Sequence, residues 1–271
     1  MVRVTLPKLI ATDLDGTLVR SDNTVSARSH RVLARLADAG VTLVAITGRG
    51  PRLLELCRRD VPSAHYLVMA QGGYIYDCAT PQSTLLHETL MPGHHAAEVV
   101  GLIERRVAHD LTVIAETDPS HDAPLIGHVI ADWPWPVPIL AGGLDEIFGG
   151  SVIKTFLRSP TVSALELLDV GRSVVPGELA TLTEAGIGFV EVCPPGTDKG
   201  SGLRRVADRL GIHRDDIIVF GDALNDLPMF EWAGHAVAVT AAHPDVKAAA
   251  DEVTGTNDED GVAAYLERLF G

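Results

Sequence analysis

The stretch "LIATDLDGTL", residues 9–18, places two aspartates, Asp13 and Asp15, directly after a short apolar run. The run predicts a buried strand over residues 8–12, with the two carboxylates at its carboxyl end. Residues two apart in an extended chain point the same way, so both carboxylates lie on one side. Two like charges so close together repel each other and lose hydration on burial. The stretch therefore predicts a neighbouring group, such as a cation, that relieves this repulsion.

Short apolar runs alternate with amphipathic stretches outward from this point, which is typical of βα units and a parallel sheet. We expect an α/β fold with a Rossmann-like core, a parallel sheet and helices on both faces. We expect residues 1–79 and 193–271 to form this core. Residues 80–192 differ in texture and predict an inserted α+β domain. Four runs within it predict antiparallel strands, over residues 111–117, 127–132, 151–157 and 187–192.

Composition excludes several classes of protein. The chain has 271 residues, 46% hydrophobic and 21% charged, which is typical of a globular protein. A net charge of −14 without a lysine or arginine run argues against a nucleic-acid or anionic-membrane surface. The three cysteines form no CxxC pair and predict reduced thiols. Apolar runs stay well below the roughly 20 residues of a membrane helix, so we expect a cytoplasmic protein without membrane or nucleic-acid partners.

Four polar clusters follow predicted strands or open predicted helices. The carboxyl ends of parallel strands share one edge of the sheet, so we expect the clusters to meet there. They are Asp13 and Asp15; Thr47, Gly48 and Arg49 after strand 41–46; Lys199 and Gly200; and Asp222, Asn225 and Asp226 after strand 216–220.

The residue types in these clusters suit phosphoryl transfer. Asp13 and Asp222 supply the hard oxygen ligands that Mg²⁺ prefers. Thr47 and Gly48 offer a hydroxyl and an open backbone N–H to a phosphate oxygen, and Lys199 adds a positive charge. One carboxylate can attack phosphorus while a second protonates the leaving group.

In their order, "DLDGT", "TGR", "DKG" and "GDALND" resemble the motifs of the haloacid dehalogenase superfamily of phosphatases. The large insertion between the second and third motifs resembles the Cof-type subgroup. This resemblance implies that residues 1–79 and 193–271 are the catalytic core and that residues 80–192 are a cap domain that sets substrate specificity. The resemblance implies that Asp13 is the nucleophile and a Mg²⁺ ligand. It makes Asp15 the acid/base, which also gives its backbone carbonyl to the metal. It further implies the following roles: Thr47, Gly48, Lys199 and Asn225 bind phosphate, Asp222 is a metal ligand, and Asp226 is an outer ligand.

Two segments depart from the subgroup's pattern. Gln71-Gly72-Gly73 stands where Asn-Gly-Ala is common, and Thr240-Ala241-Ala242 stands where Met-Gly-Asn-Ala is common. The departures predict an altered secondary contact to the substrate or to Asp222. Two basic residues are ambiguous: Arg49 contacts phosphate or substrate or caps a helix, and Lys154 reaches the substrate or is ordinary surface charge.

Two further patterns have alternative interpretations. His94, His95 and Glu98 have helical spacings that suit a metal, but no third element supplies a ligand, so a solvated helix face is favoured. The segment "DWPWPVP", residues 132–138, is either an aromatic clamp for substrate or a rigid loop with packed tryptophans, and packing is favoured.

These observations predict a Mg²⁺-dependent phosphoric monoester hydrolase that acts on a small phosphorylated metabolite, a sugar phosphate or a phosphorylated cofactor. A phosphomutase with the same nucleophile is an alternative, and a non-catalytic sensor of a phosphorylated metabolite is a weaker one. The physiological substrate and the choice between monomer and homodimer are not decided by the sequence.

Overall fold

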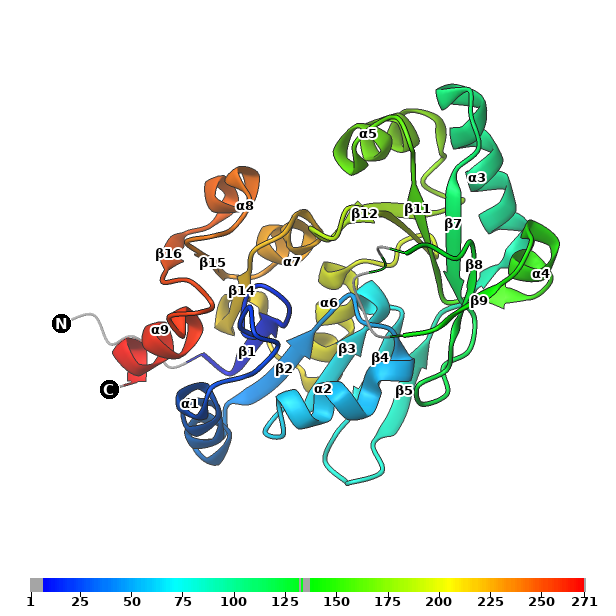
Figure 1. The fold of residues 1–271 in the computed structure, drawn as a ribbon. Coiled ribbons are helices and arrows are strands. Elements are labelled where there is room, and N and C mark those ends of the chain that lie inside the picture. Colours follow the sequence, from blue (N-terminus) through cyan, green and yellow to red (C-terminus); the bar gives the residue numbers. More distant parts are fainter. Residues whose placement is uncertain (1–6, 132, 134–136, 271) are drawn as a thin grey trace.

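The computed structural model describes residues 7–131, 133 and 137–270 of the chain. Within this part, two sheets dominate the fold, and each carries its own helices (Figure 1). We refer to the eight-stranded sheet as the larger sheet and to the six-stranded sheet as the smaller sheet. The chain builds most of the larger sheet first, passes through the smaller one, and then returns to complete the larger. The predicted α/β core with an inserted α+β region is confirmed.

The larger sheet has the strand order β16-β15-β14-β1-β2-β3-β4-β5. The strands from β16 to β3 run parallel, whereas β4 and β5 are antiparallel additions at one edge. β3 and β4 form an antiparallel hairpin, with Met69 paired to Tyr74 next to the turn. The strands are β1 (Leu9–Asp13), β2 (Thr42–Ile46), β3 (Tyr66–Met69), β4 (Tyr74–Asp77), β5 (Thr84–Glu88), β14 (Ile217–Gly221), β15 (His235–Val239) and β16 (Glu252–Thr254).

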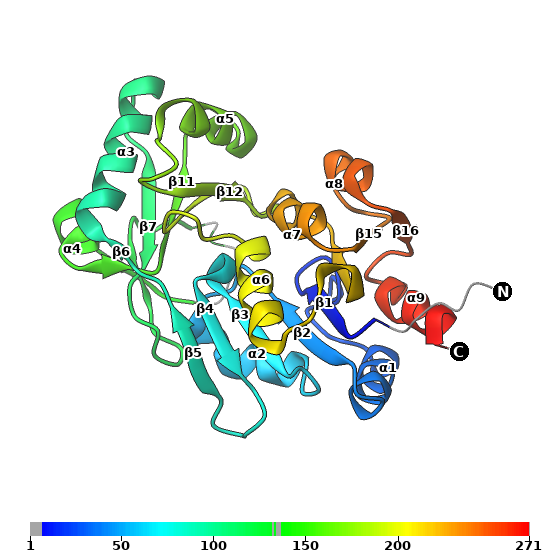
Figure 2. The same cartoon turned by 180° about the vertical axis from the view of Figure 1, so that it is seen from behind.

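Helices cover both faces of the larger sheet, as Figures 1 and 2 show from opposite sides. The alternation of side chains in β1 explains why: Ile10 packs into the cluster with α1 and α9, and Leu9 and Ala11 pack into the cluster with α6 and α7. A strand buried on both faces must be apolar throughout, which is why β1 is a continuous apolar run. One face carries α1 (Ala27–Asp38), α2 (Leu54–Asp60) and α9 (Gly261–Phe270), and the other carries α6 (Lys199–Leu210), α7 (Leu227–Trp232) and α8 (Pro244–Ala249).

Short 3₁₀ helices connect several of these elements and lie beside the strand ends. They are η1 (Pro51–Leu53), η2 (Ala70–Gly72), η3 (Arg214–Asp216) and η4 (Leu224–Asp226).

The smaller sheet has the order β12-β13-β11-β7-β8-β9. Its helices pack on one face, where they bury an apolar cluster. The opposite face carries Phe156 and Phe189, against which Trp133 packs edge-on at 5.4 Å from each ring. The elements are β7 (Thr112–Glu116), β8 (Leu125–Gly127), β9 (Ile139–Ala141), β11 (Lys154–Arg158), β12 (Thr181–Glu184) and β13 (Val190–Cys193), with α3 (Gly93–Val107), α4 (Leu144–Phe148), α5 (Ala164–Val174) and the paired strands β6 (Met91–Pro92) and β10 (Ser151–Val152).

The prediction of a strand over residues 127–132 is wrong. The strand β8 ends at Gly127, whose φ is +146°, and a Cβ there would lie 2.3 Å from the Val113 carbonyl oxygen. Asp132 lies outside the described residues. β8 pairs antiparallel with β7 and parallel with β9, a strand that the sequence analysis did not predict.

The sheets also bear on the predicted division of the chain. β5, within the predicted cap, pairs with β4 in the larger sheet, and β13 continues to Cys193 in the smaller one. The division at 80 and 192 itself stays a prediction.

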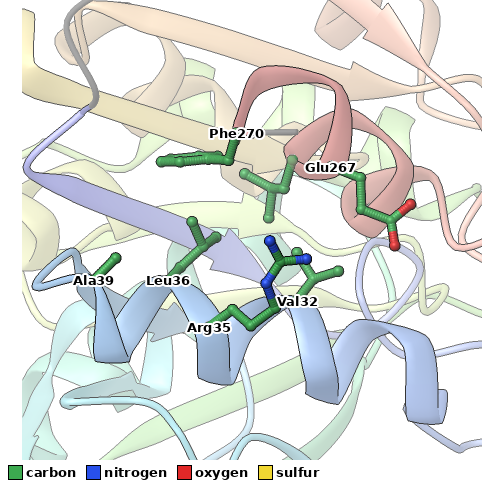
Figure 3. A pocket seen from close by; sticks show the side chains of 7 residues that line it. Val32, Arg35, Leu36, Ala39, Glu267 and Phe270 are labelled. Atoms are coloured by element: carbon green, nitrogen blue, oxygen red, sulfur yellow. The ribbon is translucent and has the colours of Figure 1, made fainter.

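A shallow groove of about 310 Å³ lies between α1 and α9. Figure 3 shows its mostly apolar side chains, among them Val32, Leu36 and Phe270, with Arg35 and Glu267 beside them. It holds none of the polar clusters singled out in the sequence. Among the helices described, none is both long and apolar enough to cross a membrane.

Candidate active site

The predicted polar clusters meet at the carboxyl ends of neighbouring strands. Asp13 ends β1, which pairs in register with β2 on one side and β14 on the other. Lys199, the first residue of α6, places its Nζ 2.6 Å from Asp13 Oδ1 and 2.6 Å from Asp226 Oδ1. Asp13, Asp222 and Asp226 each offer a carboxylate oxygen within 4.8 Å of the others. The structure thus brings together residues that are more than 200 positions apart in the chain.

Local hydrogen bonds hold this acidic cluster in place. The Asp226 Oδ2 accepts the backbone N–H groups of Asp222 and Ala223, at 2.8 and 2.9 Å. Thr17, from the "DLDGT" stretch, donates its hydroxyl to Asp222 Oδ1 at 2.6 Å. Gly16 has a φ of +85° and lies so close that a Cβ would be 2.5 Å from Asp222 Oδ2. The glycine is therefore needed for both the turn and the close approach of the carboxylate.

The electrostatics of the cluster favour an added cation. Burial raises the pKa of Asp13 well above its usual value, Lys199 opposes this, and Asp226 and Asp222 add to it. Burial and the neighbouring Asp226 raise the pKa of Asp222 to about 6. Burial alone would lower the pKa of Lys199, but Asp13 and Asp226 together hold it above its ordinary value. Lys199 therefore stays charged, but its single positive charge does not balance the negative charges of the three carboxylates.

The donor set suits a divalent metal ion. Three carboxylates and one ammonium leave two negative charges, and carboxylate oxygens are ligands that Mg²⁺ prefers. Both oxygens of Asp226 already accept hydrogen bonds, which suits an outer role better than direct ligation. The Asp15 side chain does not join the three aspartates. His94, His95 and Glu98 form no such group within the described residues.

The predicted phosphate-binding residues lie around Asp13. Thr47 is fully buried, and its Oγ1 accepts the backbone N–H of Arg49 at 3.0 Å. Gly48 and Asn225 line the cavity that opens beside Asp13. Asn225 is 5% exposed and donates its Nδ2 to Gln71 Oε1 at 3.2 Å, while its Oδ1 is buried without a hydrogen-bond partner.

Arg49 is neither free nor a simple helix cap. Its guanidinium grips both oxygens of Asp15, at 2.6 and 2.8 Å, and donates to Asp60 at 2.6 Å. Burial opposes the charge on Arg49, but the hydrogen bonds and charge of Asp15 hold its pKa above the ordinary value. The Asp15 side chain is 53% exposed and faces the cavity mouth. Arg49 thus fixes where the Asp15 carboxylate lies.

The cavity beside Asp13 has a volume of about 470 Å³. Asp13, Asp15 and Arg49 line it from the side of the larger sheet. The smaller sheet contributes the charged residues Glu116, Lys154 and Glu191, and Phe156 forms an aromatic wall there with Trp133. Its other lining residues are Asn23, Gly48, Gly50, Arg52, Leu53, Leu56, Arg59, Asp60, Ala185, Ile187, Ala223 and Asn225.

Trp133 packs against Phe156 and Phe189, as the favoured interpretation predicts, and it also lines the cavity. Its role as a clamp for substrate stays a prediction. Residues 132 and 134–136 of that segment lie outside the described part.

The interpretation of Lys154 as surface charge is wrong. It is 2% exposed and pairs with Glu191 at 2.9 Å. It also donates to the backbone oxygen of Gly48 at 2.5 Å. Glu191 and Glu116, which are also buried at this junction, were not predicted from the sequence, and Gln71 was noted there only as a departure from the subgroup's pattern. Charged residues inside the apolar strand runs "FVEV" and "TVIAE" were the available signal, since a buried charge needs a partner or a function.

The chain is similar to known proteins over nearly its whole length. The model of the haloacid dehalogenase-like hydrolase family matches residues 10–119 and 164–266. A 5-amino-6-(5-phospho-D-ribitylamino)uracil phosphatase of Bacillus subtilis, YitU, is 30% identical over 284 aligned positions, covering 98% of each chain.

Solved structures have the same fold. A haloacid dehalogenase-like hydrolase from Bacteroides thetaiotaomicron, 27% identical, matches with a TM-score of 0.74 over 97% of this chain and 100% of that one. A subclass IIB sugar phosphatase of the same superfamily, 21% identical, matches with a TM-score of 0.80 over 97% and 99%. The resemblance predicted from the four motifs is therefore confirmed, and this chain belongs to the haloacid dehalogenase-like hydrolase family.

Proposed function

We propose that this protein is a Mg²⁺-dependent phosphatase that hydrolyses a small phosphorylated metabolite in the cytoplasm through an aspartyl-phosphate on Asp13. One observation carries the proposal: Lys199 bridges Asp13 and Asp226 at 2.6 Å each, with Asp222 in the same cluster. An anion-binding lysine, an attacking carboxylate and a divalent-metal donor set thus lie within the reach of one phosphate group. We further propose that residues 80–192 act as a cap over this site.

In the first step, an oxygen of Asp13 attacks phosphorus and the ester P–O bond breaks. The leaving oxygen takes a proton from Asp15, which lines the same cavity; to carry that proton, the Asp15 carboxyl must first leave its ion pair with Arg49. In the second step, Asp15 takes a proton from water, and the oxygen of that water attacks phosphorus and releases Asp13 as a carboxylate. Lys199, Thr47, Gly48 and Asn225 bind the phosphoryl oxygens. When bound by Asp13, Asp222 and the Asp15 carbonyl, Mg²⁺ neutralises charge on the phosphoryl group.

The substrate's leaving group fills the cavity toward the smaller sheet. A volume of about 470 Å³ suits a metabolite of moderate size, and the wall offers both charged side chains and the aromatic rings of Trp133 and Phe156. The named activities of YitU and of the sugar phosphatase fit such a cavity. We therefore place the substrate among sugar phosphates and phosphorylated cofactors or their precursors.

Release of inorganic phosphate from a panel of several dozen phosphorylated metabolites tests the proposal. The panel includes sugar phosphates and 5-amino-6-(5-phospho-D-ribitylamino)uracil, each assayed with Mg²⁺ and with a chelator. We expect Mg²⁺-dependent release from a subset of the panel and none with the D13N variant. Release that survives either the chelator or D13N would refute the mechanism.

The same assay separates the alternatives. A phosphomutase would give an isomerised phosphate ester and require a bisphosphate activator, with little release of inorganic phosphate. A sensor would bind panel members without turnover. No observation favours the phosphomutase or the sensor over the phosphatase.

A further inference from the structure

Four buried side chains form a continuous hydrogen-bonded chain between the two sheets. Lys154 Nζ lies 2.9 Å from Glu191 Oε1, Gln71 Nε2 lies 2.6 Å from Glu191 Oε2, and Asn225 Nδ2 lies 3.2 Å from Gln71 Oε1. Each of the four is at most 5% exposed. Lys154 and Glu191 belong to the smaller sheet, whereas Gln71 and Asn225 belong to loops beside the larger one.

We propose that Gln71 is a positioning residue that lets Glu191 of the smaller sheet set the amide orientation of Asn225, and thereby the affinity of the site for phosphate. The inference rests on the proposed function, because it assumes that Asn225 binds a phosphoryl oxygen. Gln71 itself makes no contact with phosphate in this scheme. It acts through Asn225.

The hydrogen bonds of this four-residue network can be donated in only one direction, because its two end groups differ chemically. The Lys154 ammonium can only donate, and the ionised Glu191 carboxylate can only accept. Gln71 must therefore turn its NH₂ group to Glu191, which leaves its oxygen for Asn225. Asn225 must in turn present its own NH₂ group to Gln71. The reverse arrangement would bring the Gln71 oxygen within 2.6 Å of a carboxylate oxygen, which is repulsive.

The orientation matters for an anion. With Nδ2 committed to Gln71 through one hydrogen, its second N–H is left as a donor in a residue that lines the cavity beside Asp13. An N–H donor attracts a phosphoryl oxygen, whereas an amide oxygen in the same place would repel it. The buried Asn225 Oδ1, which has no hydrogen-bond partner, agrees with a side chain held by its NH₂ end.

The backbone conformation of Gln71 and the missing side chain at Gly48 together allow the Gln71 amide to reach Glu191. Gln71 has a φ of +59°, a left-handed conformation that a residue with a side chain adopts only when its surroundings hold it. A Cβ on Gly48 would lie 2.6 Å from Gln71 Nε2, so the glycine leaves room for the amide. The longer glutamine, in place of the asparagine common in the resembling subgroup, is what spans from Asn225 to Glu191.

The test measures the binding of inorganic phosphate in the presence of Mg²⁺ by calorimetry, without turnover. Q71M keeps the length of the side chain and removes both amide groups, and E191Q removes the acceptor-only end. We expect each variant to bind phosphate about 10-fold more weakly, the effect of losing one oriented hydrogen bond to an anion. The double variant E191Q/Q71M should bind no more weakly than Q71M, because both changes interrupt the same chain.

E184Q is the matched control. Glu184 is also buried in the smaller sheet, at 6% exposed, but its Oε1 accepts the backbone N–H of Gly188 and has no part in the chain. We expect it to bind phosphate as the wild type does. Thermal unfolding of each variant with and without Mg²⁺ checks that fold and metal binding are retained, a readout that a purely structural defect would change.

Two outcomes would overturn the inference: unchanged phosphate affinity in both Q71M and E191Q while N225A binds weakly, or additive losses in the double variant. The first leaves the proposed function intact. Conversely, a wild type that binds phosphate with the expected variant pattern but hydrolyses no ester would refute the proposed function and support the coupling.

Discussion

The charge balance around Asp13 decides what the site can do at the scale of single residues. The ammonium of Lys199 is shared between two carboxylates. Asp222 accepts the Thr17 hydroxyl, and among the described residues it has no cation of its own within hydrogen-bond distance. Buried charges are tolerated only when they are paired or bind a metal. The cluster is thus destabilising when it stands alone and becomes favourable when a divalent cation and a phosphate share it.

Replacing Asp13 with asparagine separates chemistry from folding. We expect D13N to lose at least about 10⁴-fold in turnover, because an amide cannot form the acyl-phosphate bond. Burial raises the pKa of Asp13, so the ionised form costs folding free energy at neutral pH. The metal-free variant should therefore unfold at the same temperature as the wild type or higher. A markedly lower unfolding temperature would contradict this account of the buried charge.

Metal binding should depend on pH through Asp222. The folded-state pKa of Asp222, about 6, lies above the ordinary 3.8, so without metal its protonation stabilises the fold, and this stabilisation is lost as pH rises through about 6. Since the metal binds the ionised form, the rise in unfolding temperature caused by Mg²⁺ should be larger at about pH 7.5 than at about pH 5.5. The groups that face Asp222 are Asp13, Asp226, Lys199 and the Thr17 hydroxyl.

Calorimetric scans at the two pH values, with Mg²⁺ and with chelator, measure this difference. D222N serves as the comparison and should lose both the shift and its pH dependence. An equal Mg²⁺ effect at both pH values in the wild type would contradict the assignment of Asp222.

The residues of the candidate active site could be predicted from the sequence only in part. The motif positions Asp13, Lys199 and Asp222 were predictable because each follows a strand or opens a helix, and parallel strands end at one edge. Gln71 was noticed in the sequence only as a departure from a pattern. Its partner Glu191 is 120 positions away. That contact depends on how the two sheets pack, which hydrophobic periodicity does not encode.

At the scale of elements, one contact fixes how β7 of the smaller sheet meets η1 beside the larger sheet. Glu116 ends β7, and its carboxylate lies against Gly50, the residue that precedes η1. A Cβ at Gly50 would lie 1.8 Å from Glu116 Oε1. Arg52, on η1, lies 3.4 Å from the same oxygen, and burial raises the pKa of Glu116 and lowers that of Arg52. The absent side chain at Gly50 is what lets the two elements approach.

G50A should therefore cost about 1–3 kcal/mol of unfolding free energy, as overpacking of a buried contact does. The backbone at Gly50 has a φ of −78°, which alanine adopts freely, so the cost comes from the clash alone. Denaturant unfolding measures it. In an E116A background the same change should cost much less, and G143A, where a Cβ meets nothing within 4 Å, should be near neutral. An equal cost with and without Glu116 would disprove the clash.

Elements were predicted well where periodicity was strong and poorly where geometry intervened. The helix α1 begins after Ser26, whose side chain accepts the backbone N–H of Ser29 as an N-cap, a start signal that the sequence itself carries. The predicted strand over 127–132 was wrong because β8 already ends at Gly127, and the parallel pair β8–β9 had no signal in the sequence. Such pairing depends on neighbours that a single run of sequence does not specify.

For the whole molecule, the reactivity of the three thiols measures how tightly the protein is packed around the larger and the smaller sheet. Cys57 and Cys193 are buried, and Cys78 is only partly so. Burial raises the pKa of Cys57 to about 12, and it raises those of Cys78 and Cys193 as well. In native buffer we expect a thiol reagent to modify Cys78 first and slowly, and to reach all three cysteines of the chain only after denaturation. Rapid modification of Cys57 or Cys193 in the folded protein, read by mass spectrometry, would show that the core opens.

The class and order of the whole fold were predictable because alternating strands and helices specify a layered α/β molecule. How the smaller sheet closes the cavity was not, since its strands belong to a region of weak pattern.

The strand order has a consequence for synthesis. β1 is hydrogen-bonded between β2 and β14, whose residues leave the ribosome about 200 positions after Asp13. Asp13 is therefore translated early, but Lys199 and Asp222 can surround it only after β14 has been made. If Asp13 is the nucleophile, as we propose, a nascent chain that stalls before β14 would hydrolyse no phosphate ester.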